Sequence, residues 1–278
     1  MLSPALLSAV LMLQGCSGEP AAPPPTPTPP PEAPSAPAPS IALDELKAAA
    51  ENIALVPSPA EMQKAMEKAG ISDGLSKLVI ERKLKVDVEN KDVVAVRTGV
   101  VLADALLTVK DAPKEKLIER LTTVKVGLTA LGSGADIAAT IDDLNARIGN
   151  DGISRDDLVK ELDEMHGAII PEIKFEAGEH CVPLLQAGSW LEGSNLVAAA
   201  IIKANKPEAA SQLLRQPQVA DYFLKYVQVE GGGKAPDEVI KQLDATLHKL
   251  KDIAAQPTLS AEDVKTVKAE TDAVLALL

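Results

Sequence analysis

From Ser40 to the C-terminal end of the chain, apolar residues recur at helical spacing, and the period-two alternation of a strand is essentially absent. Start and stop signals divide this pattern into separate helices. The stretch SPAE at 58–61 predicts a capping box with Pro at the first helical position, and Gly70 predicts the end of that helix. Ser154 and Ser260, each followed by acidic residues, predict two further starts. We therefore expect an all-α fold.

The same signals predict short loops, with glycine-rich breaks at 132–134, 149–152 and 231–233. Short loops favour antiparallel neighbours, so we expect a multi-helix bundle or an orthogonal helical array over 41–278. A subdomain split near residue 150 is an open alternative. The expected helices are 41–54, 59–69, 73–84, 91–110, 114–131, 135–148, 155–168, 178–204, 207–214, 217–229, 236–254 and 261–277.

The N-terminal residues 1–16 carry an apolar run, Leu6 to Leu13, that is too short to span a bilayer and has the length of a signal-peptide core. The run ends in Leu13-Gln14-Gly15-Cys16, which resembles the lipobox of bacterial lipoproteins. The resemblance implies that the signal peptide is removed and that Cys16 is lipidated. It further implies a lipid-anchored protein of the bacterial cell envelope, and Ser17 favours the outer membrane facing the periplasm. The alternative is a short apolar tail on a cytosolic protein.

Residues 17–40 hold 11 of the 21 prolines in the chain and no aliphatic side chain larger than alanine. Such a segment cannot form a packed core and favours extended polyproline II structure. At about 3.1 Å per residue, it is long enough to hold a domain roughly 70 Å from a membrane. We therefore expect a proline-rich disordered linker between the lipid anchor and the helical domain.

The charge balance is acidic, with a formal net charge of -12 and a pI near 4.8. Binding to nucleic acid requires clustered Lys and Arg that neutralise phosphates, and adsorption to anionic lipid requires a basic face. We expect neither of these partners. The expected partners are the membrane, through the lipid on Cys16, and an envelope protein.

Motifs of the common enzyme and metal-site classes are absent from the sequence. There is no GxSxG, SxxK, CxxC, HExxH or phosphate-binding loop. On a helix, the adjacent His180 and Cys181 would point about 100° apart and so could not easily share one metal ion. We therefore expect no catalytic residue, no cofactor and no metal, with Cys181 as a buried, unreactive thiol.

The expected helix 91–110 is apolar over most of its circumference, but it carries polar residues seven positions apart. Asn90, Arg97, Asp104 and Asp111 share one face at this spacing. A solvated stripe explains all four positions. The alternative is a buried ion pair between Arg97 and Asp104.

The most distinctive stretch is GSWLEGSN at 188–195, in which two glycines interrupt an expected helix at a cost of about 1 kcal/mol each. Its G-x-W-x-E-G pattern is similar to one in uncharacterised exported bacterial proteins, and this resemblance implies no activity. One interpretation is close helix packing with the indole in the core. The other is a pocket with a glycine floor, aromatic walls and one carboxylate as polar anchor. The candidate pocket residues are Gly188, Trp190, Glu192, Gly193, Tyr222 and Tyr226.

Tyr222 and Tyr226 lie four positions apart and share a helix face, which also fits a protein-interaction patch. Together, these features favour a membrane-anchored, non-catalytic envelope lipoprotein that acts in binding or envelope organisation. The alternative is a periplasmic small-ligand carrier with an apolar pocket near Trp190. An enzyme with an unfamiliar site is the third possibility.

Overall fold

The computed structural model describes residues 55–230 and 237–278, which belong to one compact unit. The expected lipidation site Cys16, the linker 17–40 and the expected helix 41–54 lie outside the described residues. Within the described ranges there are ten α-helices and no strand, which confirms the all-α fold. The helices are α2 (Pro59–Ala69), α3 (Lys91–Thr108), α4 (Lys114–Leu131), α5 (Ala135–Gly149), α6 (Arg155–Glu176), α7 (Cys181–Ala204), α8 (Ala210–Leu213), α9 (Pro217–Glu230), α10 (Asp237–Ala254) and α11 (Ala261–Leu275), with 3₁₀ turns η1 (Leu75–Lys77) and η2 (Pro207–Ala209).

The expected helix starts are confirmed by their capping contacts. The backbone N–H of Ser58 donates to the Glu61 carboxylate at 2.7 Å, and the N–H of Glu61 donates back to the Ser58 hydroxyl at 3.2 Å. Ser154 and Ser260 accept hydrogen bonds in the same way at the starts of α6 and α11. These contacts satisfy backbone donors that the first helical turn leaves without a partner.

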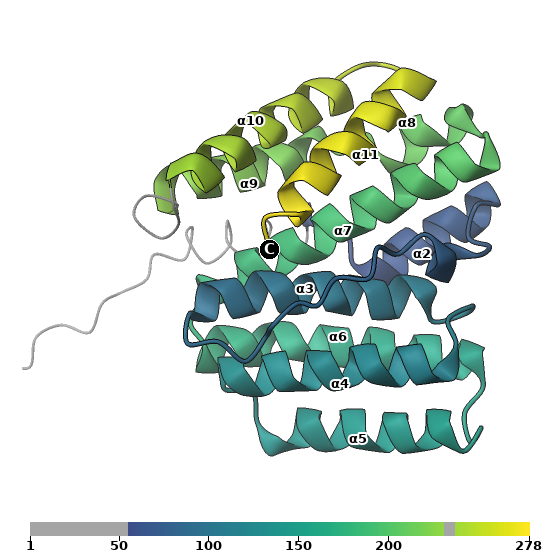
Figure 1. Ribbon diagram of the computed structural model, residues 1–278, viewed down its shortest axis with the longest axis vertical. Coiled ribbons are helices and arrows are strands. Elements are labelled where there is room, and N and C mark those ends of the chain that lie inside the picture. Colours follow the sequence, from purple (N-terminus) through teal and green to yellow (C-terminus); the bar gives the residue numbers. More distant parts are fainter. Residues whose placement is uncertain (1–54, 231–236) are drawn as a thin grey trace, which may run out of the picture. The chain divides into compact units, whose positions relative to one another are not determined.

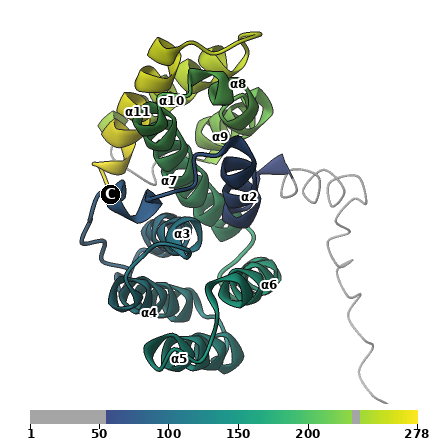
Figure 2. The same cartoon turned by 90° about the vertical axis from the view of Figure 1, so that its right-hand side faces the viewer.

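Helices α3 and α7 form the central pair, and two apolar clusters pack on opposite sides of them (Figures 1 and 2). One cluster joins α3 and the start of α7 to α4, α5 and α6. The other joins the rest of α7 and a second face of α3 to α2, α8, α9, α10 and α11. Although α7 is buried along most of its length, no helix among the described residues combines the length and hydropathy needed to cross a membrane.

The crossing of α3 and α7 depends on one glycine from each helix. A β-carbon added at Gly188 would collide with the carbonyl oxygen of Val96, and one added at Gly99 would collide with that of Leu185. The two backbones therefore touch directly, which any larger residue would prevent. This is the close packing expected for Gly188, and the contact compensates the low helix propensity of glycine.

Residues 79–87, which we call the extended segment, form neither a helix nor a strand, so the expected helix 73–84 is wrong: only the short turn η1 forms there. Side chains from Leu84 to Val88 alternate, with Leu84, Val86 and Val88 facing the apolar clusters and the intervening charged residues exposed. This is the period-two pattern of an extended chain. The segment passes over α3 without pairing with a strand (Figure 1).

Helix α6 runs eight residues beyond its expected end at 168, through Pro171. Proline removes one backbone hydrogen bond and usually ends a helix. Here Ile169 and Ile173, on either side of the proline, are both fully buried in the cluster that α6 shares with α3 and α4. Their burial outweighs the lost hydrogen bond, and the helix continues.

Candidate functional site

Glu192 lies in the middle of α7 and is fully buried, although its side chain is charged. The guanidinium of Arg82, from the extended segment over α3, donates to its Oε2 at 2.7 Å. The Arg82 side chain is itself only 13% exposed. The pair is thus a buried ion pair, whose desolvation is costly unless both partners remain in place.

Asp104 of α3 lies next to Glu192 and is also buried. Burial raises the pKa of its carboxyl well above the usual range, and the adjacent Glu192 charge raises it further. Burial also raises the pKa of Glu192, but Arg82 opposes that change. Because Glu192 has the closer cation, we assign the proton to Asp104.

The assigned proton also accounts for the hydrogen bonding of the carboxyl pair. Among the described residues, no N–H or hydroxyl group donates to Oδ1 of Asp104 or to Oε1 of Glu192. A proton on Asp104 supplies the missing donor and links the two carboxyl groups. The pair therefore meets its own hydrogen-bonding needs inside the core.

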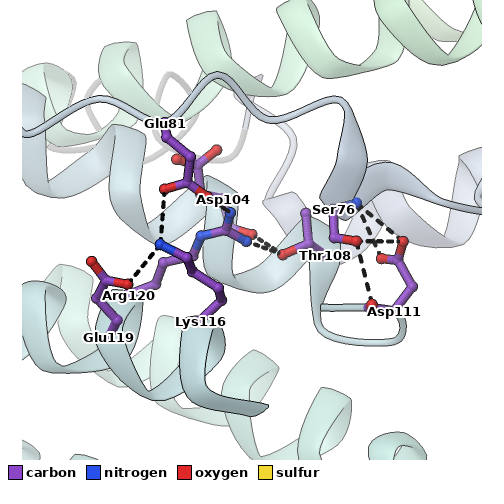
Figure 3. A network of polar contacts seen from close by, with 8 residues as sticks. All are labelled: Ser76, Glu81, Asp104, Thr108, Asp111, Lys116, Glu119 and Arg120. Carbon is purple, nitrogen blue, oxygen red and sulfur yellow. Dashed lines mark hydrogen bonds and ion pairs between the residues drawn. The ribbon is translucent and has the colours of Figure 1, made fainter. Parts of the chain in front are cut away.

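Arg120 extends this polar network from α4 toward α3 (Figure 3). Its guanidinium donates to the Thr108 hydroxyl at 2.7 Å and to the Glu81 carboxylate at 3.3 Å. The Thr108 hydroxyl in turn donates to the backbone carbonyl of Asp104 at 2.5 Å. The network joins α3, α4, α7 and the extended segment through groups that already have partners.

The expected solvated stripe is confirmed only in part: Asn90 and Asp111 are exposed, whereas Arg97 is half-buried and Asp104 is buried. The backbone N–H of Ser76 donates to the Asp111 carboxylate at 3.1 Å, as Figure 3 shows, and Arg97 donates to the carbonyl of Lys85 at 2.9 Å. Asp104 is buried, and its neighbour is Glu192 rather than Arg97, so the alternative of an Arg97–Asp104 ion pair is wrong. The stripe is the surface on which η1 and the extended segment rest.

The six candidate pocket residues do not come together in one site. Trp190 is buried against Phe223, with ring centroids 5.4 Å apart, and its indole N–H donates to Gln216 at 2.9 Å. A β-carbon added at Gly193 would collide with the sulfur of Met62. Gly188 packs against α3, and Glu192 pairs with Arg82. The residues of α7 thus point to different neighbours around the helix, as successive helical positions must.

Tyr222 and Tyr226 do lie together, along a surface groove of about 670 Å³ between the start of α7 and α9. The Tyr226 hydroxyl donates to the backbone carbonyl of His180 at 3.0 Å. Pro183 and Val229 also line the groove, and Val229 is 77% exposed. Neither Trp190 nor Glu192 contributes to this groove.

His180 adjoins a second group of polar atoms at the same end of the fold. Its Nε2 lies 3.2 Å from Oδ1 of Asp92 in α3 and 3.5 Å from Sγ of Cys181. The expected divergence of His180 and Cys181 is wrong: His180 precedes α7 with helical backbone angles, φ -67° and ψ -22°, but its imidazole reaches back to the thiol of the next residue. Asp92 is not among the residues expected from the sequence, because it is 88 positions away from His180 along the chain.

Comparison with known proteins adds no assignment: no family model, curated protein or solved structure matches this chain.

Proposed function

We propose that this chain is a membrane-anchored, non-catalytic lipoprotein of the bacterial envelope. In this proposal Cys16 carries the lipid, residues 17–40 span the distance from the outer membrane, and the helical domain binds an envelope protein in the periplasm. The support for the anchor is the Leu13-Gln14-Gly15-Cys16 sequence and the proline-rich segment after it.

The groove between α7 and α9 carries the binding part of the proposal. Its apolar lining, Pro183, Tyr222, Tyr226 and Val229, is accessible, whereas the polar network around Glu192 is enclosed. Tyrosines provide a large apolar area with a polar hydroxyl, which suits a surface that is exposed to solvent in the free protein and buried when a partner binds.

The charged groups along the groove mostly have partners within the domain. Lys174 pairs with Glu179 at 2.7 Å, and Asp221 accepts from Lys225 at 2.8 Å and also pairs with Lys251. Because these charges are compensated, the affinity for a partner comes mainly from apolar contact. We therefore infer that the occupant is a partner segment with apolar side chains.

Site-specific photocrosslinking in intact cells tests the binding surface. A photoreactive residue at Val229 should give a discrete crosslinked partner band, and Tyr222→Ser should weaken that band severalfold. The matched control is the same photoreactive residue at Phe175, which is 85% exposed but does not line the groove. Equal crosslinking from positions 175 and 229 would contradict a specific surface at the groove.

Cell fractionation tests the anchor separately. Replacing Cys16 with Ala should move the chain from the membrane fraction to the soluble fraction, because the acyl chains are lost. Unchanged membrane retention of the Cys16→Ala chain would refute lipidation as the tether, whatever the crosslinking shows.

A further inference from the structure

We propose that Asp92, His180 and Cys181 form a binding site for one divalent transition-metal ion, with Zn²⁺ as the ion that fits best. This site goes beyond the proposed partner binding and does not depend on it. The three side chains offer an oxygen, a nitrogen and a sulfur, which is a ligand set that Zn²⁺ accepts.

The spacing of the three ligand atoms matches a metal centre. Nε2 of His180 lies 3.2 Å from Oδ1 of Asp92 and 3.5 Å from Sγ of Cys181, and all three atoms lie within 4.8 Å of one another. Zn–N and Zn–O bonds of about 2.0 Å and a Zn–S bond of about 2.3 Å place tetrahedral ligand atoms about 3.3–3.6 Å apart. The side chains therefore need only small adjustments to reach an ion between them.

The contacts converge on one nitrogen, which distinguishes this group from a proton relay. In a catalytic triad, the nucleophile and the carboxylate contact opposite nitrogens of the imidazole. Here Asp92 and Cys181 both approach Nε2 of His180. A proton on Nε2 can form a well-aligned hydrogen bond to only one of the two neighbours at a time. A metal ion between the three side chains can bind all three atoms.

The backbone around the site is held in place from several directions. Asn90 caps α3 by accepting from the N–H of Asp92 at 2.9 Å, and Tyr226 holds the carbonyl of His180. The glycine contact at Gly188 keeps α3 and α7 close together. Such support preorganises the ligands, so little ordering is required when an ion binds.

Exposure and charge both suit a cation that enters from the surface. The side chains of His180 and Asp92 are 45% and 26% exposed, whereas Cys181 is fully buried beneath them. Asp92 and a Cys181 thiolate together balance the two charges of the ion, and binding displaces the thiol proton to solvent. The first turn of α7 favours the negative thiolate. The groove reaches His180, so a remaining coordination position is open to water or a ligand.

Cobalt titration tests the site because a Co²⁺–thiolate bond gives a charge-transfer absorption. We would use the full-length chain with Cys16→Ala, purified and stripped with chelator, so that Cys181 is the single thiol. The expected result is one Co²⁺ per chain with thiolate absorption, and displacement of Co²⁺ by Zn²⁺. Cys181→Ser should abolish the absorption, and His180→Ala should weaken Zn²⁺ binding by at least about tenfold.

The matched control is His248→Ala, because His248 also pairs with an aspartate, Asp244, at 3.3 Å on an exposed helix face. This variant should bind Zn²⁺ as the parent chain does. Since Cys181→Ser changes a buried side chain, His180→Ala and Asp92→Asn, at more exposed positions, provide the decisive comparison, with circular dichroism to confirm folding. Unchanged Zn²⁺ affinity in His180→Ala, or thiolate absorption that persists in Cys181→Ser, would overturn the proposal.

Discussion

The middle of α7 and its N-terminal end both pack against α3, but polar side chains are enclosed in the middle and accessible at the end. In the middle, the buried Glu192 is paired with Arg82, and its second neighbour is the buried carboxyl of Asp104. At the end, His180 and Tyr226 lie beside a groove and remain accessible. The comparison teaches that a buried charged network can be part of the framework, whereas accessible polar atoms at a helix end are the better candidates for binding.

The strongest test of this contrast is to remove the cation from the middle of α7. Arg82→Met should lower the free energy of unfolding by about 3–5 kcal/mol, because Glu192 would stay buried without its partner. Urea unfolding followed by circular dichroism measures this. The control, Lys64→Met, breaks the exposed Lys64–Asp163 pair and should cost less than about 1 kcal/mol. Equal costs for the two variants would show that Glu192 is not part of a buried pair.

Gly188→Ala tests the backbone contact between α3 and α7. The added β-carbon collides with the Val96 carbonyl, so we expect a loss of about 1–3 kcal/mol in unfolding free energy. Gly167 on α6 is a matched control, since a β-carbon there would meet no atom within 4 Å. Gly167→Ala should stabilise the chain by about 0.5–1 kcal/mol through helix propensity. A stabilising Gly188→Ala would contradict the close crossing.

The proton assigned to Asp104 predicts a pH dependence. A raised pKa in the folded state means that the folded chain binds more protons than the unfolded chain. The folded state is therefore destabilised as the pH rises above the ordinary pKa range of an aspartate carboxyl. Asp104→Asn mimics the protonated acid and escapes this loss. Relative to the parent chain, the variant should therefore gain stability with rising pH, by at most about 1.4 kcal/mol per pH unit. Unfolding curves at several pH values measure the difference, and a difference that stays constant with pH would refute the assignment.

At the groove, Tyr226→Phe should have the smallest effect. The substitution removes one hydrogen bond, to the His180 carbonyl, from a half-buried position, so we expect a cost of about 0.5–1.5 kcal/mol. Thermal unfolding measures it. A loss as large as that of Arg82→Met would mean that the N-terminal end of α7 is as essential to the framework as its middle.

Local signals in the sequence predicted most of the fold. Capping residues such as Ser58 and Ser260 act within four positions of the chain, so their effect is visible without tertiary structure. The extended segment 79–87 was missed because its alternation is short and the helical periodicity around it is dominant. The end of α6 was missed because burial of Ile169 and Ile173 on both sides of Pro171 overrides a local stop signal.

The candidate sites were less predictable because they depend on contacts between distant positions. Tyr222 and Tyr226 were paired correctly, since a spacing of four residues on a helix sets their common face. The pocket around Trp190 and Glu192 was not assembled, because these two side chains lie on different sides of α7. Asp92 was overlooked because only the packing of α3 against α7 brings it to His180.

The sequence by itself determined the helical class, most helix ends and one of the two glycines of the close crossing, Gly188, because periodicity, caps and side-chain size act over a few residues. Only the tertiary structure decided which polar groups are enclosed and which are reachable. This depends on desolvation, which arises when distant segments such as 79–87 cover part of a helix face. For this reason Arg97 of α3 holds the carbonyl of Lys85 in the extended segment. The accessible start of α7 is where we expect binding.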